Sequence, residues 1–309
     1  MTSPDPNPYA GGCAWVNGEF VPVRDAKVSI FDAGFTRSDV TYDVVAVWNG
    51  RFFRLGDHLD RFARSVEQLR LQLPVDTDGL AAILHGCVAR AGLRAAYVDM
   101  ICTRGVTTTG SRELLEHKNR LYAYAIPYVW IVPEEQQALG TDLVIASTSR
   151  RIPPESVDPT VKNFHWGDFV RGQLEVVDRP GTAVVLPDGD GCITEGPGYN
   201  VFALVDGAFV TPASGVLQGV TRRAVLDIAA EAGIPAGAGI LRADDLRRAD
   251  EAFLTSTAGG VMPVVSIDGR PVGEGKPGPL TTQLRQRYWD AHDDPRWTTP
   301  VDYSLSSQA

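Results

Sequence analysis

Lysine is scarce in this chain of 309 residues: only four of its 29 basic residues, counting lysine and arginine together, are lysines. Arginine and lysine are interchangeable as solvated surface charges but not as nucleophiles, because only an amine loses its proton near neutral pH and forms a Schiff base. Lys162 follows a strand-like run and a turn that contains Pro159, and its sequence neighbours are apolar and aromatic. It is therefore either a buried amine with a chemical role or a lysine whose charged end reaches the surface.

Other scarcities exclude whole classes of protein. The net charge of -9 leaves no basic excess that could neutralise nucleic-acid phosphates. No apolar run approaches the length of a membrane span. The five histidines lack the spacing of metal ligands, so we expect no metal. The four cysteines form no Cys-x-x-Cys pair, which favours reduced and mostly buried thiols in a cytoplasmic protein.

The length suits one large domain or two ordinary ones. Residues 1–12 are rich in proline, glycine and aspartate and have neither the basic nor the apolar region of a signal peptide, so we expect a disordered tail. Residues 13–132 combine β-rich runs with two helices, one capped by Asp57 and one over Leu80–Ala91, which predicts a small two-layer α+β domain. A change to proline, glutamate and glutamine predicts an interdomain linker over residues 133–140.

Residues 141–309 contain short strand-like runs separated by Asp-Gly turns, with helical segments between them. A helix is predicted over residues 166–178, and a second one runs from about Thr221 to Ala232. The apolar residues expected on one face of the first of these helices are Phe169, Val170, Leu174 and Val177. The mixture predicts a larger, barrel-like α/β domain, so the fold class of the whole chain is α/β (α+β).

Glu195 is a second residue with a candidate chemical role. It stands at the end of a strand-like run beside Gly196 and Gly198, where a ligand can approach. The alternative is an ordinary solvated carboxylate in a turn, which is the usual position of an acidic residue.

Two segments have the pattern of anion sites. Leu217–Arg222 places Gly219 and Thr221 at the start of a helix, where N–H groups and a hydroxyl bind an anion, or where Thr221 is simply an N-cap. Phe253–Gly260 places three hydroxyl residues and two glycines after a strand, which is either a phosphate cradle or a polar turn. Arg61, on the first helix, is by itself a surface arginine.

Together these features meet the needs of one cofactor. Pyridoxal 5′-phosphate requires an amine for its aldehyde, an anion site for its phosphate and an acid facing its ring nitrogen. Lys162, the two anion segments and Glu195 supply all three in one chain. The combination, and no single motif in it, predicts an enzyme that uses pyridoxal phosphate.

At these residues the sequence resembles the class IV aminotransferases, the fold type IV group of pyridoxal-phosphate enzymes, from Trp15 to about Tyr303. Within this group it looks most like the (R)-selective amine transaminases. The stretches that carry the resemblance are Ser38–Val44, Asp57–Arg61, Asp158–Asn163, Trp166–Asp168, Leu217–Arg222 and Thr257–Gly260. The resemblance implies fold type IV, with a small two-layer N-terminal domain and a larger pseudo-barrel C-terminal domain.

The resemblance also implies roles for individual residues. Lys162 would form the Schiff base and carry the proton of the substrate carbon, and Glu195 would pair with the ring nitrogen. The residues implied to hold the cofactor phosphate are Arg61, Val220, Thr221, Ser256 and Thr257. The residues implied to shape the substrate pockets are Tyr42, Val44, Tyr97 and Trp166. Arg112 matches a mobile arginine that receives the carboxylate of the amino acceptor.

Three positions depart from the pattern of related enzymes. Arg37 stands where the amine transaminases often carry histidine, and it either binds a substrate carboxylate, which would favour D-amino acids, or is a surface arginine at a dimer edge. Asp99 stands where they tend to have glutamate, so its reach toward the substrate is shorter. Gly167 stands where branched-chain aminotransferases place a tyrosine, which weakens the branched-chain interpretation.

The implied activity is transfer of an amino group from an (R)-amine, with D-amino acids as further donors, to a keto acid such as pyruvate. The alternatives are a D-amino acid or branched-chain aminotransferase, a pyridoxal-phosphate lyase of the aminodeoxychorismate lyase type, and a globular protein without a cofactor. The expected partners are the small-molecule amine and keto acid, with neither nucleic acid nor membrane. The resemblance implies a homodimer whose active sites take residues from both subunits.

Overall fold

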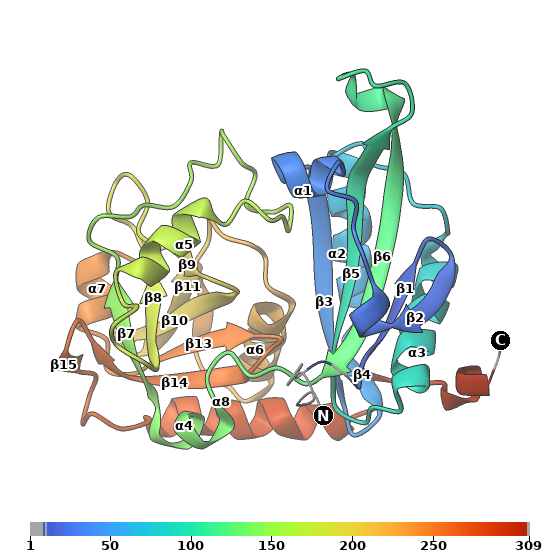
Figure 1. Ribbon diagram of the computed structural model, residues 1–309. Coiled ribbons are helices and arrows are strands. Elements are labelled where there is room, and N and C mark those ends of the chain that lie inside the picture. Colours follow the sequence, from blue (N-terminus) through green and yellow to red (C-terminus); the bar gives the residue numbers. More distant parts are fainter. Residues whose placement is uncertain (1–8, 10, 308–309) are drawn as a thin grey trace, which may run out of the picture. The chain divides into compact units, whose positions relative to one another are not determined.

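The structure is a computed structural model that describes residue 9 and residues 11–307 (Figure 1). The disordered tail expected over residues 1–12 therefore lies mostly outside the described residues. The chain folds into two compact units. The first comprises Met1–Val129, Val161–Phe164 and Pro295–Ala309, and the second comprises Trp130–Thr160 and His165–Asp294.

The first unit is built on an antiparallel sheet. Its strands are β1 (Cys13–Val16), β2 (Glu19–Pro22), β3 (Val40–Trp48), β4 (Arg51–Phe53), β5 (Ala96–Thr107), β6 (His117–Pro127) and β16 (Thr298–Pro300). Their order across the sheet is β16-β4-β3-β5-β6-β1-β2. Its helices are α1 (Ala33–Arg37), α2 (Leu55–Gln68) and α3 (Thr77–Ala91), with single turns η1 (Val23–Asp25), η2 (Leu114–Glu116) and η4 (Tyr303–Ser307).

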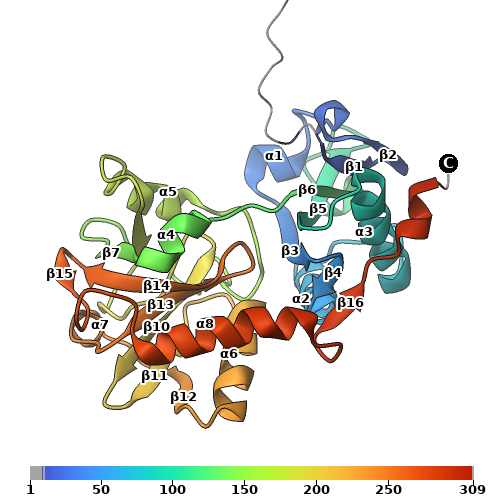
Figure 2. The same ribbon diagram turned by 90° about the horizontal axis from the view of Figure 1, so that it is seen from below.

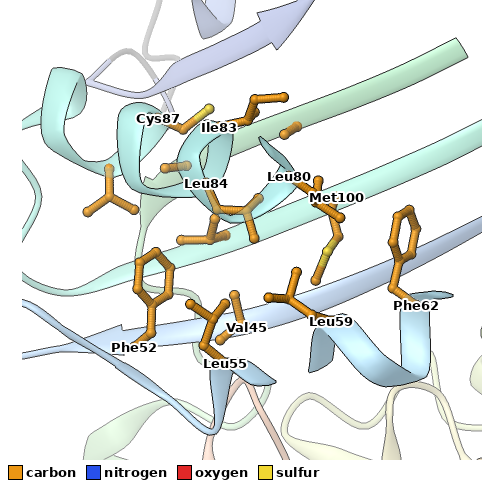
Figure 3. Packing of buried hydrophobic residues seen from close by; sticks show 14 of the residues in the cluster. Val45, Phe52, Leu55, Leu59, Phe62, Leu80, Ile83, Leu84, Cys87 and Met100 are labelled. Atoms are coloured by element: carbon orange, nitrogen blue, oxygen red, sulfur yellow. The ribbon is translucent and has the colours of Figure 1, made fainter. Parts of the chain in front are cut away.

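One face of this sheet packs against α2 and α3. Because side chains alternate along a strand, every second residue of β3 and β5 faces the helices. Val45 and Met100 of the sheet, Phe62 of α2 and Leu84 of α3 belong to one core of almost fully buried side chains (Figure 3). Gly92 ends α3 in the left-handed conformation, with φ 65°, as the sequence predicts. The alternate residues on β3 and β5 face away from this core.

The second unit contains a mixed sheet. Its strands are β7 (Thr141–Ile145), β8 (Thr182–Val185), β9 (Glu195–Gly196), β10 (Tyr199–Val205), β11 (Ala208–Pro212), β12 (Ala236–Gly239), β13 (Ala252–Ser256), β14 (Gly260–Ile267) and β15 (Arg270–Pro271). The main path is β12-β11-β10-β13-β14-β7-β8, with β9 on β10 and β15 on β14. The pairs β7/β8, β7/β14 and β11/β12 are parallel.

Helices flank this second sheet. They are α4 (Glu134–Leu139), α5 (Gly167–Leu174), α6 (Val220–Glu231), α7 (Ala243–Arg247), α8 (Pro279–Asp290) and the single turn η3 (Ala291–Asp293). Helix α8 runs beside β14 and α6 (Figure 2). Across the described residues, we find no helix that is long and apolar enough to span a membrane, and no metal-like grouping of acidic, histidine and cysteine side chains.

The α+β architecture with two sheets confirms the predicted fold class. The predicted domain boundaries remain a proposal: the compact units place Val161–Phe164 and Pro295–Ala309 with the first unit, and residues 133–140 contain helix α4. One local prediction is wrong, because α2 begins at Leu55 and Asp57 lies inside its first turn.

A second local prediction is also wrong. Phe169 on α5 is buried, as expected, but Val170, Leu174 and Val177 are exposed. The helix lies against the sheet through Phe169 and Gly172, where an added Cβ at position 172 would come within 2.7 Å of Leu186. Helix α5 therefore packs on the sheet through the side that holds Gly172, and fewer of its apolar side chains are buried than the sequence pattern predicts.

Candidate active site

Lys162 lies in a short segment that runs beside strand β3 in the first unit. Its backbone carbonyl accepts a hydrogen bond from the N–H of Tyr42 at 3.1 Å and another from the hydroxyl of Thr41 at 2.7 Å. Thr41 and Asn163 also form an isolated antiparallel bridge. The lysine is therefore fixed to a sheet strand although it belongs to no helix or strand itself.

The amine of Lys162 is turned toward an aromatic side chain. Its Nζ donates a hydrogen bond to Oη of Tyr42 at 3.2 Å and lies 4.3 Å from the centre of the same ring. The ring of Phe164 lies 4.4 Å from that of Tyr42. Lys162 is half-buried. Its amine is thus held by specific contacts and does not simply extend into solvent.

Four predicted substrate residues share the sheet face that turns away from α2 and α3. Val44 on β3 is the direct cross-strand partner of Asp99 on β5, and Tyr42 and Tyr97 lie two residues along from them on the same face. Val44 and Asp99 are buried. The structure therefore brings Tyr42, Val44, Tyr97 and Asp99 together on one face, and Tyr42 links that face to Lys162.

Asp99 is an acid in an unusual setting. Oη of Tyr124 donates to its Oδ2 at 2.9 Å, while its Oδ1 has no hydrogen-bond partner in the described part of the chain. Burial raises the pKa of Asp99 to about 8, against the opposing effects of the Tyr124 hydrogen bond and the charge of Lys162. Tyr124 was not among the predicted site residues.

Arg61 is not the surface arginine that its position alone suggests. It is buried on α2, where its Nε donates to Oδ2 of Asp43 at 2.7 Å and its Nη2 to Oδ1 at 2.8 Å. His58 contacts the same carboxylate through Nδ1 at 2.8 Å. Burial alone would raise the pKa of Asp43, but the charge and hydrogen bonds of Arg61 hold it well below its usual range. The guanidinium is therefore fixed in place.

The two other predicted arginines lie elsewhere. Arg37 is the last residue of α1, and Arg112 precedes η2 in the connection from β5 to β6. Both side chains are exposed. The structure does not bring either of them into the group formed by Lys162, Tyr42 and Asp99.

Glu195 is buried in the second unit, on β9, and is not a solvated turn residue. Its Oε2 accepts from the N–H of Leu217 at 3.0 Å and from Nδ2 of Asn200 at 3.3 Å. Its Oε1 lies 3.3 Å from Nε and 3.2 Å from Nη2 of Arg151. All four partners are N–H donors, so Glu195 acts here as an acceptor, which is the role of an ionised carboxylate.

Arg151 joins Glu195 to a second acid. Its Nη1 donates to Oδ2 of Asp168 at 2.7 Å, and its guanidinium lies 4.2 Å from the centre of the Phe169 ring. The loop before it is anchored by Glu175, whose carboxylate accepts hydrogen bonds from residues 147–149. Arg151, Asp168 and Asn200 were not predicted as site residues. Asp168 ends the stretch Trp166–Asp168 that carries the family resemblance, whereas no local motif could have identified Arg151.

The residues of the second unit that were predicted to hold the cofactor phosphate lie at two places, the start of α6 and the turn after β13. Val220 and Thr221 open helix α6, whose N-terminus has Gly219 as its N-cap and no side-chain cap. Ser256 ends β13, where its hydroxyl donates to the carbonyl of Gly198 at 2.8 Å and accepts from the N–H of Ala258 at 3.2 Å. Thr257 follows directly in the turn. The uncapped helix N-terminus is suited to an anion.

Trp166 precedes α5 in the second unit and is half-buried. Its ring meets Phe169 edge to face at a centroid distance of 5.7 Å. An added Cβ on Gly198, in the turn before β10, would lie 3.8 Å from the indole. Trp166 therefore lies near the glycine-rich turn that follows Glu195.

Sequence relatives of this chain are aminotransferases. It is 31% identical over 278 residues to a putative branched-chain-amino-acid aminotransferase of Methanocaldococcus jannaschii, which covers 89% of this chain and 95% of the relative. It is 30% identical over 284 residues to a D-alanine aminotransferase of Staphylococcus aureus, which covers 90% of this chain and 98% of the relative.

Solved structures and a family profile agree with these relatives. A branched-chain amino acid aminotransferase from T.th., solved with pyridoxamine 5′-phosphate, superimposes with a TM-score of 0.87 at 29% identity, covering 94% of this chain and 99% of that one. The profile of the family Amino-transferase class IV matches residues 41–267, which is well over half of the chain. The chain therefore belongs to the class IV aminotransferases and has their fold type IV architecture.

Proposed function

We propose that this enzyme transfers an amino group from an (R)-amine, with D-amino acids as secondary donors, to a keto acid such as pyruvate. The composition of the sheet face next to Lys162 carries this proposal. Its three cross-strand rows are Tyr42–Ile101–Tyr122, Val44–Asp99–Tyr124 and Ala46–Tyr97–Ile126. These rows contain no basic side chain that could attract a substrate carboxylate, whereas their aromatic and aliphatic groups suit an apolar amine.

The residues of the chain fit pyridoxal 5′-phosphate as cofactor. Glu195 presents an acceptor carboxylate, α6 begins without a side-chain cap, and Lys162 supplies a half-buried amine. The residues proposed to hold the cofactor are Lys162 and Arg61 of the first unit and Glu195, Val220, Thr221, Ser256 and Thr257 of the second. When bound, the cofactor supplies an electron sink for the substrate carbon that bears the amine.

The chain's own contribution to the reaction centres on Lys162. Its Nζ, once uncharged, is the base that takes the proton from the substrate carbon and returns it at a neighbouring position. Tyr42 accepts a hydrogen bond from this nitrogen at 3.2 Å and so orients it on the sheet face. Arg151 holds the Glu195 carboxylate in a fixed position, where it favours a protonated nitrogen facing it.

The relatives favour a second candidate function. Both a D-alanine aminotransferase and a putative branched-chain aminotransferase are similar to the chain over most of its length. A D-amino acid or branched-chain aminotransferase would need a cation for the carboxylate of the donor as well as for that of the keto acid acceptor. The candidates are Arg37 and Arg112, both of which are exposed.

Substrate assays separate these functions. Both enantiomers of 1-phenylethylamine, D-alanine and L-leucine are tested as donors, with pyruvate and other keto acids as acceptors. We expect (R)-1-phenylethylamine to be the preferred donor, with slower turnover of D-alanine. Activity toward L-leucine alone would contradict the proposal, and release of pyruvate without consumption of a keto acid would indicate a lyase.

Lys162 is tested by borohydride reduction of the yellow holoenzyme followed by peptide mapping. We expect the cofactor to be fixed on Lys162, and Lys162→Ala to lose both the visible absorption band and the activity. Lys276→Ala is the matched control, because Lys276 is exposed and pairs with Glu274 at the surface. Labelling of any other lysine would contradict the assignment.

We also propose that the enzyme is a homodimer with shared active sites. An apolar segment around α1 supports this, because Ile30, Phe31 and Phe35 are 68%, 74% and 72% exposed. Sedimentation velocity on the purified enzyme is expected to give twice the mass of one chain. A monomer at micromolar concentration would contradict this part of the proposal.

A further inference from the structure

Asp99 is a buried acid to which the reaction described above gives no role. Its side chain is 3% exposed, and its Oδ1 has no hydrogen-bond partner in the described part of the chain. Buried polar atoms are almost always paired, so an unpaired oxygen on the sheet face that also carries Tyr42, the hydrogen-bond partner of Lys162, points to a group that the chain itself does not supply. A substrate is such a group.

The surroundings of Asp99 determine whether that oxygen carries a proton. Burial disfavours the ionised form, whereas the hydrogen bond from Tyr124 and the charge of Lys162 favour it. The titratable groups that influence it from the neighbouring strands and the lysine segment are Tyr97, Tyr124, Asp43 and Lys162. The net result is a pKa of about 8, so the carboxyl is mostly protonated at neutral pH and ionised above that value.

Protonation changes what Asp99 offers to a ligand. A protonated carboxyl can donate a hydrogen bond to a carboxylate, whereas an ionised one repels a carboxylate and only accepts. The three rows of this face hold no basic side chain that would offset that repulsion.

We infer that Asp99 is a specificity-determining residue that admits carboxylate-bearing substrates only while it is protonated, and that its ionisation weakens the binding of amino acid donors and keto acid acceptors alike. This inference rests on the proposed function, because it takes the face of Tyr42, Val44 and Asp99 as the substrate face. It makes the preference for simple amines over amino acids increase with pH.

The direct test is binding of an inert carboxylate to the holoenzyme. The dissociation constant of hydrocinnamate is measured by calorimetry between about pH 7 and about pH 9, with hydrocinnamide as the uncharged control ligand. If binding requires protonated Asp99, hydrocinnamate should bind about tenfold more weakly at the higher pH. The control ligand should show no such change.

Two variants assign the effect to this side chain. Asp99→Asn should remove the pH dependence of hydrocinnamate binding. Tyr124→Phe should move its midpoint to higher pH, because it removes a hydrogen bond that favours the ionised form. A merely structural role for Asp99 predicts neither result. If Asp99→Asn fails to fold, the midpoint of the pH dependence of hydrocinnamate binding in Tyr124→Phe decides whether Asp99 is the titrating group.

The inference is overturned if wild type and Asp99→Asn show the same pH dependence, if the midpoint in Tyr124→Phe does not move, or if wild type binds no hydrocinnamate at neutral pH. A parallel assay compares kcat/KM for (R)-1-phenylethylamine and D-alanine. Absence of turnover with every amine would contradict the proposed function instead, and the binding titration would still decide the role of Asp99.

Discussion

The guanidinium of Arg151 holds the buried carboxylate of Glu195 through two nitrogens, at 3.3 and 3.2 Å from the same oxygen. The remaining nitrogen donates to Asp168. One positive charge thus lies between two buried negative ones, and Arg151 forms an ion pair with each acid. The position of Glu195, and with it the proposed contact to the cofactor ring, depends on this arginine.

Replacing Arg151 by methionine is expected to destabilise the enzyme by about 3 kcal/mol, because two buried carboxylates lose their counter-charge. Urea unfolding measures this loss, and fluorescence titration should show weaker binding of pyridoxal 5′-phosphate. Arg171→Met on the exposed side of α5 is the matched control and should change neither quantity. Unchanged cofactor affinity in Arg151→Met would show that Glu195 does not depend on Arg151.

Gly219→Ala is expected to weaken cofactor binding without straining the backbone, since φ at this position is -60°. The added Cβ would overlap Oδ1 of Asn200, whose amide donates to Glu195 and to the carbonyl of Leu217. Displacing that amide should lower cofactor affinity about tenfold, the equivalent of ~1.4 kcal/mol. Equilibrium titration with the cofactor measures the effect.

A matched glycine serves as the control for this substitution. Gly237, on the short strand β12, has no atom within 4 Å of an added Cβ. Gly237→Ala should therefore leave the affinity for the cofactor unchanged. If both variants bind the cofactor like wild type, the close packing of Gly219 on Asn200 has no functional role.

Tyr42→Phe isolates the hydrogen bond to Lys162. The variant keeps the ring that lies 4.3 Å from Nζ and packs on Phe164, but it loses the hydroxyl acceptor. A hydrogen bond between uncharged groups contributes about 1 kcal/mol, so kcat should fall by roughly fivefold while the cofactor stays bound. Tyr303→Phe, which removes a hydroxyl that donates to the carbonyl of Leu93 away from this face, is the control. Equal kcat in both variants would mean that the Tyr42 hydroxyl does not orient the amine.

Glu175 makes the loop before Arg151 sensitive to acid. Burial would raise the pKa of Glu175, but hydrogen bonds from Ser147, Thr148 and Ser149 lower it to about 2 from the ordinary value of 4.5. The stability that these contacts provide is therefore fully present above pH 4.5 and is lost as pH falls toward 2.

The advantage in free energy of unfolding of wild type over Glu175→Gln should accordingly shrink across that interval. Urea unfolding of both proteins at a series of pH values measures it. A difference that does not change with pH would show that the charge of Glu175 does not hold this loop.

The sequence suggests candidates for the chemistry of this enzyme but not the contacts that support them. Lys162 and Glu195 could be selected because few residue types can perform the roles proposed for them. Arg151 could not, because it lies 44 positions from Glu195 and a buried arginine looks like a surface one in sequence. The contact of Tyr42 with Lys162 spans 120 positions and accompanies the isolated bridge between Thr41 and Asn163, which no local pattern specifies.

Some helix ends and strands could be predicted from the sequence, but other helix boundaries and buried faces could not. The turn at Gly92 and the apolar strand β3 follow from intrinsic preferences of their residues. The start of α2 does not, because Arg54 adopts the left-handed conformation there, with φ 56°, and pairs with Asp57, a residue otherwise suited to an N-cap. The exposed side of α5 shows that apolar periodicity identifies a helix but not the width of the face that a neighbour covers.

The first compact unit is assembled from three stretches of chain, of which the shortest, Val161–Phe164, carries Lys162, the lysine proposed to bind the cofactor. A single crossover between genes of two related enzymes, placed anywhere between positions 130 and 160, would therefore take Lys162 from one parent and Tyr42 from the other. Chimaeras intended to exchange donor preference should inherit both stretches from the same parent. Laboratory evolution by shuffling should recover them as a linked pair.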